Sequence, residues 1–368
     1  MTDTIDKIIK DVQEIPPYLF EAGSLRSLEA ILLKKRAVDS DYAVFLIDHY
    51  FQGQLDKLGS LPVYKQDWMH FVDTTSEPTT DDINILRDRL LGCDKENPVA
   101  VIGIGGGATM DVAKALSNLL TNKGNAEDYQ GWDLVKIPGV FKVGIPTVSG
   151  TGAEASRTCV MINPRNGVKL GMNSEHTVFD QLILDPDLTR TVPSNQYFYS
   201  GMDSYIHCME ILKGSHRNLL ADELSVQTMK LCREVFFDDD MKSSSNRRKL
   251  MMASFLGGLA VANSYVGLVH PFSAGLSVVL GVHHCMANCI TMTAMEDFYP
   301  KEFEEFISMV ERQKTDLPKG LCNNLDQNQY ESLYQATILH EKPLTNALGS
   351  DFRNILTKEK VKELFLHM

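Results

Sequence analysis

No stretch of this sequence approaches the length of apolar chain that a membrane-spanning helix needs. Residues 1–7 are polar and acidic, so they lack the apolar core of a secretory leader. Internal repeats and low-complexity tracts are missing too. We therefore expect a soluble, unprocessed protein that has no membrane partner.

The sequence also lacks the CxxC pairs of a zinc ribbon or a redox motif. Its seven cysteines are odd in number and scattered along the chain. They are Cys93, Cys159, Cys208, Cys232, Cys285, Cys289 and Cys322. Because disulfide frameworks need paired cysteines and an oxidising compartment, we expect reduced thiols and a cytoplasmic location, with most of the thiols buried.

Basic residues are in the minority, since 36 Lys and Arg accompany 48 Asp and Glu and give a net charge of -12. A surface with this balance repels polyanions, so nucleic acid is not an expected partner. The hydrophobic share of 43% is enough, in a chain of 368 residues, to build two domain cores.

The first half of the chain alternates short β-branched runs with segments of helical period. The runs are residues 42–48, 98–104, 142–147 and 181–185. Each run ends in or beside Gly, Asp or Pro, and this alternation is typical of a parallel α/β sheet whose strand ends carry functional loops.

After Pro186 the pattern changes to long segments of helical period. These are residues 197–212, 221–235 and 248–265, and a polar stretch at 238–248 is expected to be a solvated loop. The sequence therefore predicts an α/β domain over 1–186 and an all-α domain over 187–368. A cleft at the hinge after Pro186 is a natural place for a substrate.

Residues 99–114, VAVIGIGGGATMDVAK, form an apolar run, a glycine turn and a helix start. Glycine backbone N–H groups at a helix N-terminus can surround a pyrophosphate, so a diphosphate-bearing ligand is expected. Gly103, Gly105 and Ala108 fit the loose dinucleotide fingerprint, which alone is weak, whereas the triple glycine followed by Asp111 and Lys114 is more specific.

Asp48 ends an earlier apolar run, residues 43–47. A carboxylate at the end of such a strand can accept hydrogen bonds from ribose hydroxyls and repels a 2′-phosphate, which favours NAD over NADP. Its position alone equally suits a turn or helix cap.

Four residues in the helical half could share a metal ion. Asp203 and His207 are four apart and so lie on one face of a helix, while His270 and His284 stand in apolar, small-residue surroundings. Three imidazoles and a carboxylate suit a borderline divalent ion and would make a Lewis-acid site. A surface pair at Asp203 and His207 and buried core histidines are the alternatives, and His283 should point away from its neighbour's ion.

These features together resemble the iron-dependent, or group III, alcohol dehydrogenase family. The matching motifs occur in the family's order: Gly105, Gly106 and Gly107 with Asp111 and Lys114; PTVSGTGAE at 146–154; Asp185 with Pro186; Asp203 with His207; and His270 with His284.

The resemblance implies a Rossmann-like domain that holds NAD and a helical domain that holds Fe²⁺ or Zn²⁺, in a chain that is expected to form a homodimer. The implied metal ligands and catalytic centre are Asp203, His207, His270 and His284. The implied cofactor contacts are Asp48, Gly105, Gly106, Gly107, Asp111, Thr147, Ser149, Thr151 and Lys169. Many members have a histidine where this chain has Ala274, and His283 is a candidate substitute for that proton relay.

Within the family, residues 125–135 and 152–158 resemble the branch that oxidises C8 of 3-deoxy-D-manno-octulosonate to an aldehyde. That resemblance implies a step in lipopolysaccharide biosynthesis followed by an aminotransferase. Arg157 could pair with the carboxylate of such a sugar acid, and the alternative is an ordinary surface ion pair.

Three other functions remain open on the sequence. One is a generic short-chain alcohol or aldehyde dehydrogenase of the same family. Another is a sugar-phosphate cyclising lyase that uses NAD only transiently, although few basic residues besides Lys213 and Arg217 are available for a phosphate. The third is a dinucleotide sensor without catalysis, in which the histidines are core residues.

Overall fold

The computed structural model describes residues 15–92 and 96–368, so residues 1–7 and Cys93 lie outside the described part. The described residues form two compact units, one made of residues 15–92, 96–148 and 153–191 and the other of 149–152 with 192–368. The boundary after residue 191 lies beyond the predicted hinge at Pro186. The reason is that Leu188, in the short helix η6 (Pro186–Thr189), belongs to the hydrophobic core of the first unit.

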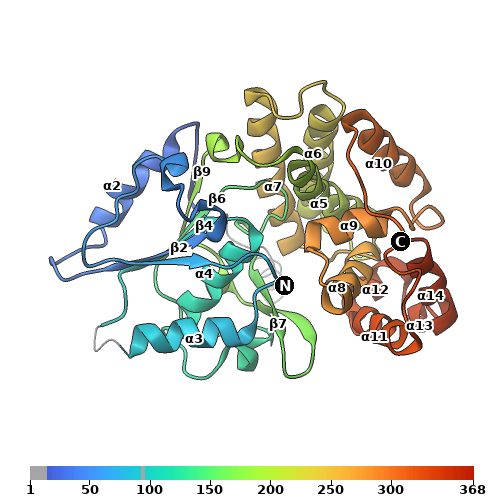
Figure 1. Ribbon diagram of the computed structural model, residues 1–368, viewed down its shortest axis with the longest axis horizontal. Helices are drawn as coiled ribbons and strands as arrows, with labels where there is room; N and C mark the ends of the chain where they lie inside the picture. Colours follow the sequence, from blue (N-terminus) through green and yellow to red (C-terminus); the bar gives the residue numbers. More distant parts are fainter. Residues whose placement is uncertain (1–14, 93–95) are drawn as a thin grey trace, which may run out of the picture. The chain divides into compact units, whose positions relative to one another are not determined.

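A six-stranded sheet forms the centre of the first unit (Figure 1). Its strands are β1 (Tyr18–Phe20), β2 (Ala43–Asp48), β3 (Trp68–Val72), β4 (Ala100–Gly105), β6 (Lys142–Pro146) and β9 (Gln181–Leu184). They are hydrogen-bonded in the order β1-β9-β6-β4-β2-β3, and every pairing is parallel. The predicted parallel α/β fold is confirmed.

Continuous apolar sequence explains the central strands. In β2 and β4 nearly every side chain is buried, and Phe45, Ile47, Ile102 and Ile104 pack in one hydrophobic cluster. The helices of this unit are α2 (Leu28–Leu33), α3 (Thr80–Leu91) and α4 (Gly107–Leu119). Because the strands are parallel, their carboxyl ends place Asp48 and Gly105 at the same edge of the sheet.

A second, smaller sheet in this unit was not predicted. It contains β5 (Gly131–Trp132), β7 (Thr158–Asn163) and β8 (Val168–Asn173) in the order β5-β8-β7, and β7 pairs with β8 in an antiparallel hairpin that is visible below β7 in Figure 1. Alternate residues of β7 are buried. Such a half-buried strand lacks the continuous apolar run that identifies the central strands.

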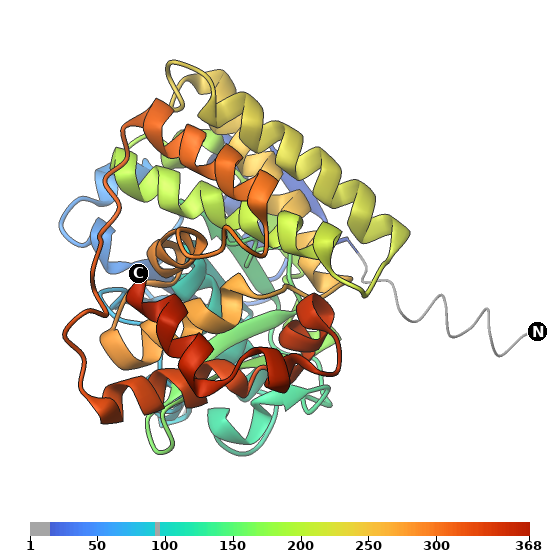
Figure 2. The same cartoon turned by 90° about the vertical axis from the view of Figure 1, so that its right-hand side faces the viewer.

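The second unit is helical, as predicted. Its helices are α5 (Ser194–Lys213), α6 (Leu219–Phe236), α7 (Ser244–Ala262), α8 (Val269–Leu280), α9 (His284–Met292), α10 (Pro300–Gln313), α11 (Gln327–Ile338), α12 (Glu341–Leu348), α13 (Phe352–Ile355) and α14 (Lys358–Leu366). Helices α5, α6 and α7 pack side by side in both views (Figures 1 and 2).

One boundary in this unit differs from the prediction. The polar stretch at 238–248 is a loop only as far as Ser243, whose hydroxyl accepts the Asn246 N–H and caps α7. Serine is a favoured N-cap, so the helix begins within the polar stretch, and residues 244–248 are helical rather than loop.

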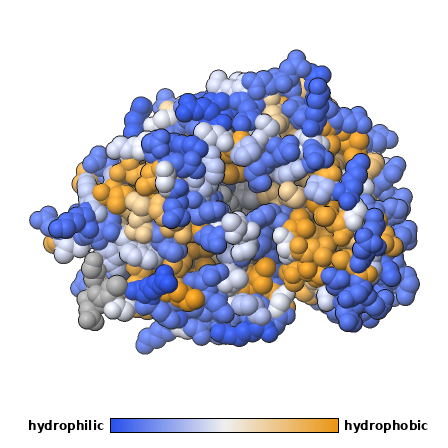
Figure 3. Space-filling view, viewed as in Figure 1, coloured by the Kyte–Doolittle hydropathy of each residue, from blue (hydrophilic) through white to orange (hydrophobic). Residues whose placement is uncertain are grey.

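Among the described residues, no helix is both long and apolar enough to span a membrane. The face in Figure 3 is largely hydrophilic, with hydrophobic residues in separate patches. The six cysteines within the described ranges are buried and free, as expected for reduced thiols.

Candidate metal centre and dinucleotide loop

Helix α5 supplies the first two residues of the centre. Its residues from Tyr197 to Ile211 are almost all buried, so the helix lies inside its unit rather than on the surface. Asp203 and His207, four residues apart, therefore project together into the interior, with side-chain exposures of 0% and 8%. A buried carboxylate at this depth requires compensating partners.

Two further histidines complete the group. His270 lies in the first turn of α8 and His284 is the first residue of α9. Their Nε2 atoms lie 3.5 Å and 3.7 Å from the Asp203 carboxylate, and His207 Nε2 lies 3.7 Å from it. One ligand atom from each of the four residues lies within 4.8 Å of every other.

These separations fit one ion. Bonds of about 2.0–2.2 Å in a tetrahedral shell place neighbouring ligand atoms roughly 3.4 Å apart. The three distances between nitrogen and carboxylate oxygen are only slightly longer. Among the described residues, the buried His207 Nδ1 has no hydrogen-bond partner, so that ring is not held as an ordinary hydrogen-bonded core histidine.

Electrostatics also favour a ligand set over a surface pair. Burial opposes ionisation of Asp203, but the three neighbouring histidines hold the pKa of its carboxyl well below the usual value. Burial lowers the pKa of His207 to about 3, so this imidazole is neutral near pH 7. An anionic carboxylate and a neutral imidazole are the protonation states that metal ligands need.

Glu210 is a residue of the centre that the sequence analysis missed. Its side chain is fully buried on α5, Oε2 lies 2.5 Å from His270 Nδ1, and the carboxylate also accepts the Val269 N–H. Burial works against a charged His270, but Glu210 and Asp203 raise the pKa of its ring to about 9. At that pKa the ring carries a proton on both nitrogens near pH 7, so a metal ion would have to displace the Nε2 proton, while the Glu210 carboxylate keeps the Nδ1–H.

We expect Glu210→Gln to weaken metal binding by about 10- to 100-fold. A glutamine has one oxygen where two acceptors are needed, so its amide N–H₂ group must face either the Val269 N–H or His270 Nδ1. The measurement is a chelator titration of bound metal, with thermal unfolding of the metal-free protein alongside. Glu234→Gln, which alters a surface pair with Lys249, is the matched control. Equal metal affinity in E210Q and wild type would show that Glu210 does not position His270.

Helix α9 contributes two more contacts to Asp203. The Asn288 amide lies 2.6 Å from Asp203 Oδ1, and the Cys285 thiol lies 3.6 Å from Oδ2. Both follow His284 on the same helix, and neither was singled out in the sequence. They help to fix the orientation of the carboxylate.

The structure also shows where His283 and Ala274 lie, the two positions considered for a proton relay. His283 caps α9, is exposed, and lies outside the four-residue group, as expected for a neighbour that points in another direction. Ala274 lies four residues after His270 on α8 and has no proton to transfer.

The glycine turn lies between β4 and α4, where a diphosphate site is expected. A Cβ on Gly105 would lie 2.4 Å from Thr109 Oγ1 and 2.9 Å from Asp48 Cβ, so only glycine fits. Gly106 is the N-cap and Gly107 the first residue of α4. The buried Thr109 Oγ1 has no partner within the described ranges, and nothing in the sequence pattern had distinguished this threonine.

Asp48 acts as a cap and also faces the glycine turn. Its Oδ1 accepts from the Tyr50 N–H at 3.0 Å and from the Thr74 hydroxyl at 2.9 Å. The structure therefore supports the cap interpretation, and contact with a ribose hydroxyl remains a prediction.

Asp111 and Lys169 lie in one ionic group of the first unit. Lys169 Nζ is 3.1 Å from Glu77, with side-chain exposures of 8% and 18%. Burial raises the pKa of Asp111 to about 7 against the opposing effect of Lys114 and Lys169. Both residues were predicted as cofactor contacts, and that role remains a prediction.

Lys114 holds the backbone that follows the PTVSGTGAE motif. Its fully buried Nζ donates to the carbonyls of Ser156 at 2.8 Å and Thr158 at 3.0 Å. Burial lowers the pKa of this lysine to about 8. The lysine of the glycine motif is therefore a structural anchor for residues 153–158.

The middle of that motif, residues 149–152, packs on two helices of the second unit. A Cβ on Gly150 would lie 1.6 Å from the Ser200 carbonyl oxygen, and one on Gly152 would lie 2.4 Å from Gly258 Cα. Of the predicted contacts, Ser149 is buried and Thr151 half-buried. In the first unit, Thr147 N–H donates to the Gly105 carbonyl at 2.9 Å.

Arg157 forms an ion pair with Asp133 in the first unit, and the Asp133 side chain is 64% exposed. This contact corresponds to the surface-pair alternative rather than to an unengaged guanidinium. A substrate role for Arg157 remains a prediction.

Two family models match the chain and together cover most of it. Residues 16–186 match iron-containing alcohol dehydrogenase, and residues 197–338 match the C-terminal domain of the Fe-containing alcohol dehydrogenase family. The chain belongs to the iron-containing alcohol dehydrogenase family. Asp203, His207, His270 and His284 all lie within the C-terminal match.

Curated members of this family show moderate similarity to the chain. Sulfoacetaldehyde reductase of Bilophila wadsworthia (strain 3_1_6) is 33% identical over 227 residues, which cover 60% of this chain and 57% of that protein. NAD-dependent methanol dehydrogenase of Bacillus methanolicus is 31% identical over 203 residues, 54% of this chain and 52% of that protein. The match thus spans little more than half the length of each.

Solved structures of the iron-containing alcohol dehydrogenase type share the fold. A 1,3-propanediol oxidoreductase superimposes with a TM-score of 0.80 at 17% identity, covering 96% of this chain and 98% of that one. A sulfoacetaldehyde reductase from Bifidobacterium kashiwanohense in complex with NAD⁺ gives 0.78 at 17% identity, covering 96% and 97%. At this identity the likeness establishes the architecture alone.

Proposed function

We propose that this chain is an NAD- and divalent-metal-dependent oxidoreductase that interconverts a primary alcohol and an aldehyde. The observation that carries the proposal is the four-residue group on α5, α8 and α9, in which three imidazoles surround one fully buried carboxylate. Iron, the metal of the family name, is our first choice, and zinc accepts the same ligands.

The residues of the chain have separate tasks in this scheme. A divalent ion, when bound, polarises a substrate oxygen and lowers the pKa of its hydroxyl, and NAD accepts the hydride. Asp203 and the three histidines hold the ion, while Glu210 keeps His270 in the tautomer that binds it.

The first unit binds the dinucleotide. The N–H groups of Gly106 and Gly107 at the start of α4, with the Thr109 hydroxyl, suit the pyrophosphate. Asp48 accepts a ribose hydroxyl.

Oxidation removes a hydride from the carbon and a proton from the hydroxyl. Ala274 cannot carry that proton, so we assign its release to water or to His283, which is exposed and adjacent to His284. The balanced conversion is primary alcohol plus NAD⁺ to aldehyde, NADH and H⁺.

The substrate we propose is 3-deoxy-D-manno-octulosonate, an anionic sugar acid that would be oxidised at C8. A generic short-chain alcohol is the alternative. The match to sulfoacetaldehyde reductase supports an anionic substrate class. The aldehyde product would be consumed by an aminotransferase in lipopolysaccharide biosynthesis, and we propose a homodimer as the working assembly.

A cyclising lyase is a poorer fit to the site. The two basic residues that would hold a substrate phosphate are both engaged, Lys213 with Glu302 at 3.0 Å and Arg217 with Asp222 at 2.8 Å. A phosphate would have to break these pairs.

The test is NADH release during turnover. Iron- or zinc-loaded protein is mixed with NAD and with 3-deoxy-D-manno-octulosonate, isethionate or 1-propanol, and absorbance at the NADH band is followed. We expect NADH to accumulate in proportion to aldehyde, fastest with the sugar acid. Product formation without NADH release would support the lyase, and 1-propanol as the best substrate would support the generic dehydrogenase.

A further inference from the structure

The side-chain amide of Asn288, on α9, lies inside the metal-binding group of α5, α8 and α9. The residue is 0% exposed, and its amide nitrogen lies 2.6 Å from Asp203 Oδ1, 3.3 Å from His270 Nε2 and 3.4 Å from His284 Nε2. The histidine nitrogens themselves lie 3.5 Å to 3.7 Å from the Asp203 carboxylate. The end of this amide is therefore as close to the ligand atoms as the imidazoles are to the carboxylate.

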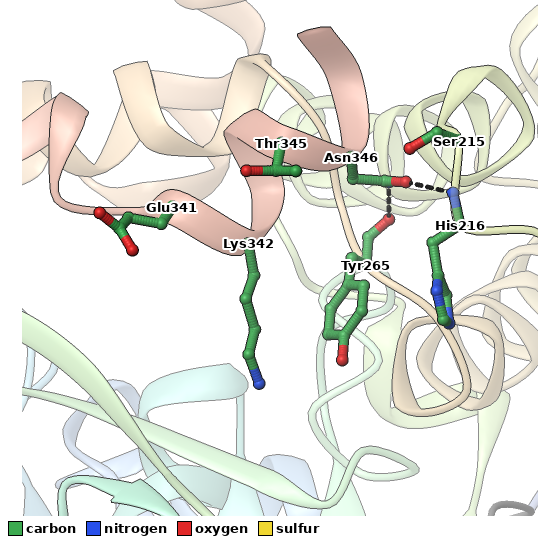
Figure 4. A pocket seen from close by; sticks show the side chains of 7 residues that line it. All are labelled: Ser215, His216, Tyr265, Glu341, Lys342, Thr345 and Asn346. Carbon is green, nitrogen blue, oxygen red and sulfur yellow. Dashed lines mark hydrogen bonds between the residues drawn. The ribbon is translucent and has the colours of Figure 1, made fainter. Parts of the chain in front are cut away.

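A second buried asparagine shows how an amide is satisfied when both of its ends have partners. Asn346 on α12 is 4% exposed and lines the cavity in Figure 4. Its nitrogen donates to the Tyr265 carbonyl at 2.8 Å and its oxygen accepts the His216 N–H at 2.7 Å, as the dashed lines show. Asn288 differs, because among the described residues its buried Oδ1 has no hydrogen-bond partner. A buried acceptor of this kind is destabilising until a donor or a cation reaches it.

The nitrogen end of the Asn288 amide does not suit a position beside a cation. An amide NH₂ group carries partial positive charge and only donates, and an imidazole nitrogen that binds a metal has no lone pair left to accept from it. The contacts with His270 and His284 therefore cannot persist next to an ion. Of the three contacts, only the hydrogen bond to Asp203 would remain.

The oxygen end of the same amide fits that position. The χ2 torsion of asparagine is broad and roughly two-fold, so a half-turn of the amide exchanges its oxygen and its nitrogen. The half-turn gives up the hydrogen bond to Asp203, and it brings the otherwise unpartnered Oδ1 next to the ligand atoms. Side-chain amide oxygens bind divalent cations, as carboxylate oxygens do. A bound cation therefore favours the turned amide.

The number of ligands bears on which metal the group prefers. Zn²⁺ in proteins is almost always four-coordinate and tetrahedral, so Asp203 and the three histidines already fill its shell. Fe²⁺ takes a larger shell, as in the sites where two histidines and a carboxylate leave further positions open. An oxygen from Asn288 would add a fifth protein ligand and still leave a sixth position for a substrate oxygen.

We propose that Asn288 Oδ1 is a fifth protein ligand of the ion, and that this oxygen makes the group select Fe²⁺ over Zn²⁺. The proposal rests on the proposed function, because it concerns the ion assigned there. It settles a choice between metals that three imidazoles and one carboxylate leave open.

The first measurement is the visible spectrum of Co²⁺-loaded protein, because tetrahedral Co²⁺ absorbs intensely and five- or six-coordinate Co²⁺ absorbs weakly. We expect weak bands in wild type and in Asn288→Asp, which keeps an oxygen at the same place. Asn288→Leu keeps the branched shape without the oxygen and should give intense bands. Thr291→Val is the matched control: Thr291 is another buried polar residue of α9, and its hydroxyl has no partner among the described residues. T291V should give the wild-type spectrum.

The second measurement is metal selectivity. Anaerobic competition with a chelator gives the dissociation constants of Fe²⁺ and Zn²⁺ for each variant. In N288L the affinity for Fe²⁺ should fall about 10-fold or more relative to the affinity for Zn²⁺. A residue that acts only by holding Asp203 would change both affinities equally, since both ions bind that carboxylate. If N288L does not fold, the Fe²⁺ to Zn²⁺ ratio of Asn288→Ala takes its place.

Three results overturn the proposal: intense tetrahedral bands in wild type, weak bands that persist in N288L, or equal losses of Fe²⁺ and Zn²⁺ affinity when the amide is removed. The first needs no variant. Neither measurement contains NAD or an alcohol, so this idea and the proposed function fail separately. A protein that selects iron through Asn288 but forms no NADH contradicts the proposed function alone. An enzyme that forms NADH while N288L loses both metals equally contradicts the fifth ligand alone.

Discussion

We expect His270→Ala to lose its bound metal and to lower kcat/KM by roughly 10³-fold or more, because a Lewis acid supplies several kcal/mol of catalysis. The substitution removes one of three imidazoles that face Asp203 and leaves Glu210 as a buried carboxylate without its partner. Metal content per chain and the rate of NADH formation are the two measurements.

The NAD affinity of this variant should remain close to that of wild type, since the glycine turn belongs to the other unit. His367→Ala, at the end of α14, is the control for loss of a histidine elsewhere. Full metal content together with full turnover in H270A would contradict the ligand assignment.

Gly258→Ala should have the second large effect. Its Cβ would lie 2.3 Å from the Gly152 carbonyl oxygen and 2.8 Å from Gly152 Cα, and a backbone neighbour cannot move aside as a flexible side chain can. We expect the free energy of unfolding to fall by about 3 kcal/mol. The substitution would displace residues 149–152. Because this segment includes the predicted cofactor contacts Ser149 and Thr151, the NAD affinity should fall as well.

The adjacent glycine of the same helix is the matched control. In Gly257→Ala the new Cβ meets Thr228 Cγ2 at 3.4 Å, an ordinary contact, and alanine improves helix propensity by up to about 1 kcal/mol. Chemical denaturation of both variants checks the pair. Equal unfolding midpoints for G257A and G258A would show that residues 149–152 do not pack closely against α7.

The sequence was sufficient to predict the elements whose pattern is local. Strands β2 and β4 are continuous apolar runs, and helices α5 and α6 have a helical period, so their existence and type were predicted correctly. The hairpin of β7 and β8 was missed because only some residues of each strand are buried, and β8 contains polar residues such as Lys169 and Asn173. Its pairing depends on contacts across the unit.

In the candidate site, too, local sequence pattern predicted some residues, while others depend on contacts between distant parts of the chain. Spacing by four placed Asp203 and His207 on one helix face, and His270 and His284, which were also predicted as ligands, lie in the same group in the structure. Glu210 was overlooked, although it lies three residues after His207 on the same helix. Its role depends on Val269 and His270, about 60 residues away in the chain, and single-sequence periodicity carries no such information.

Lys114 was placed in the right motif, but its long-range contacts were not foreseen. The sequence named Lys114 only as part of the glycine motif, and in the structure its ammonium donates to carbonyls about 40 residues further along the chain. A buried lysine needs several acceptors, and only the folded loop supplies them.

The most direct test of the account is anomalous scattering at the iron absorption edge from crystals of iron-loaded protein. We predict one peak per chain, about 2.0–2.3 Å from Asp203, His207, His270 and His284. A peak at any other position, or four side chains around a space without anomalous density in iron-replete active protein, would contradict it.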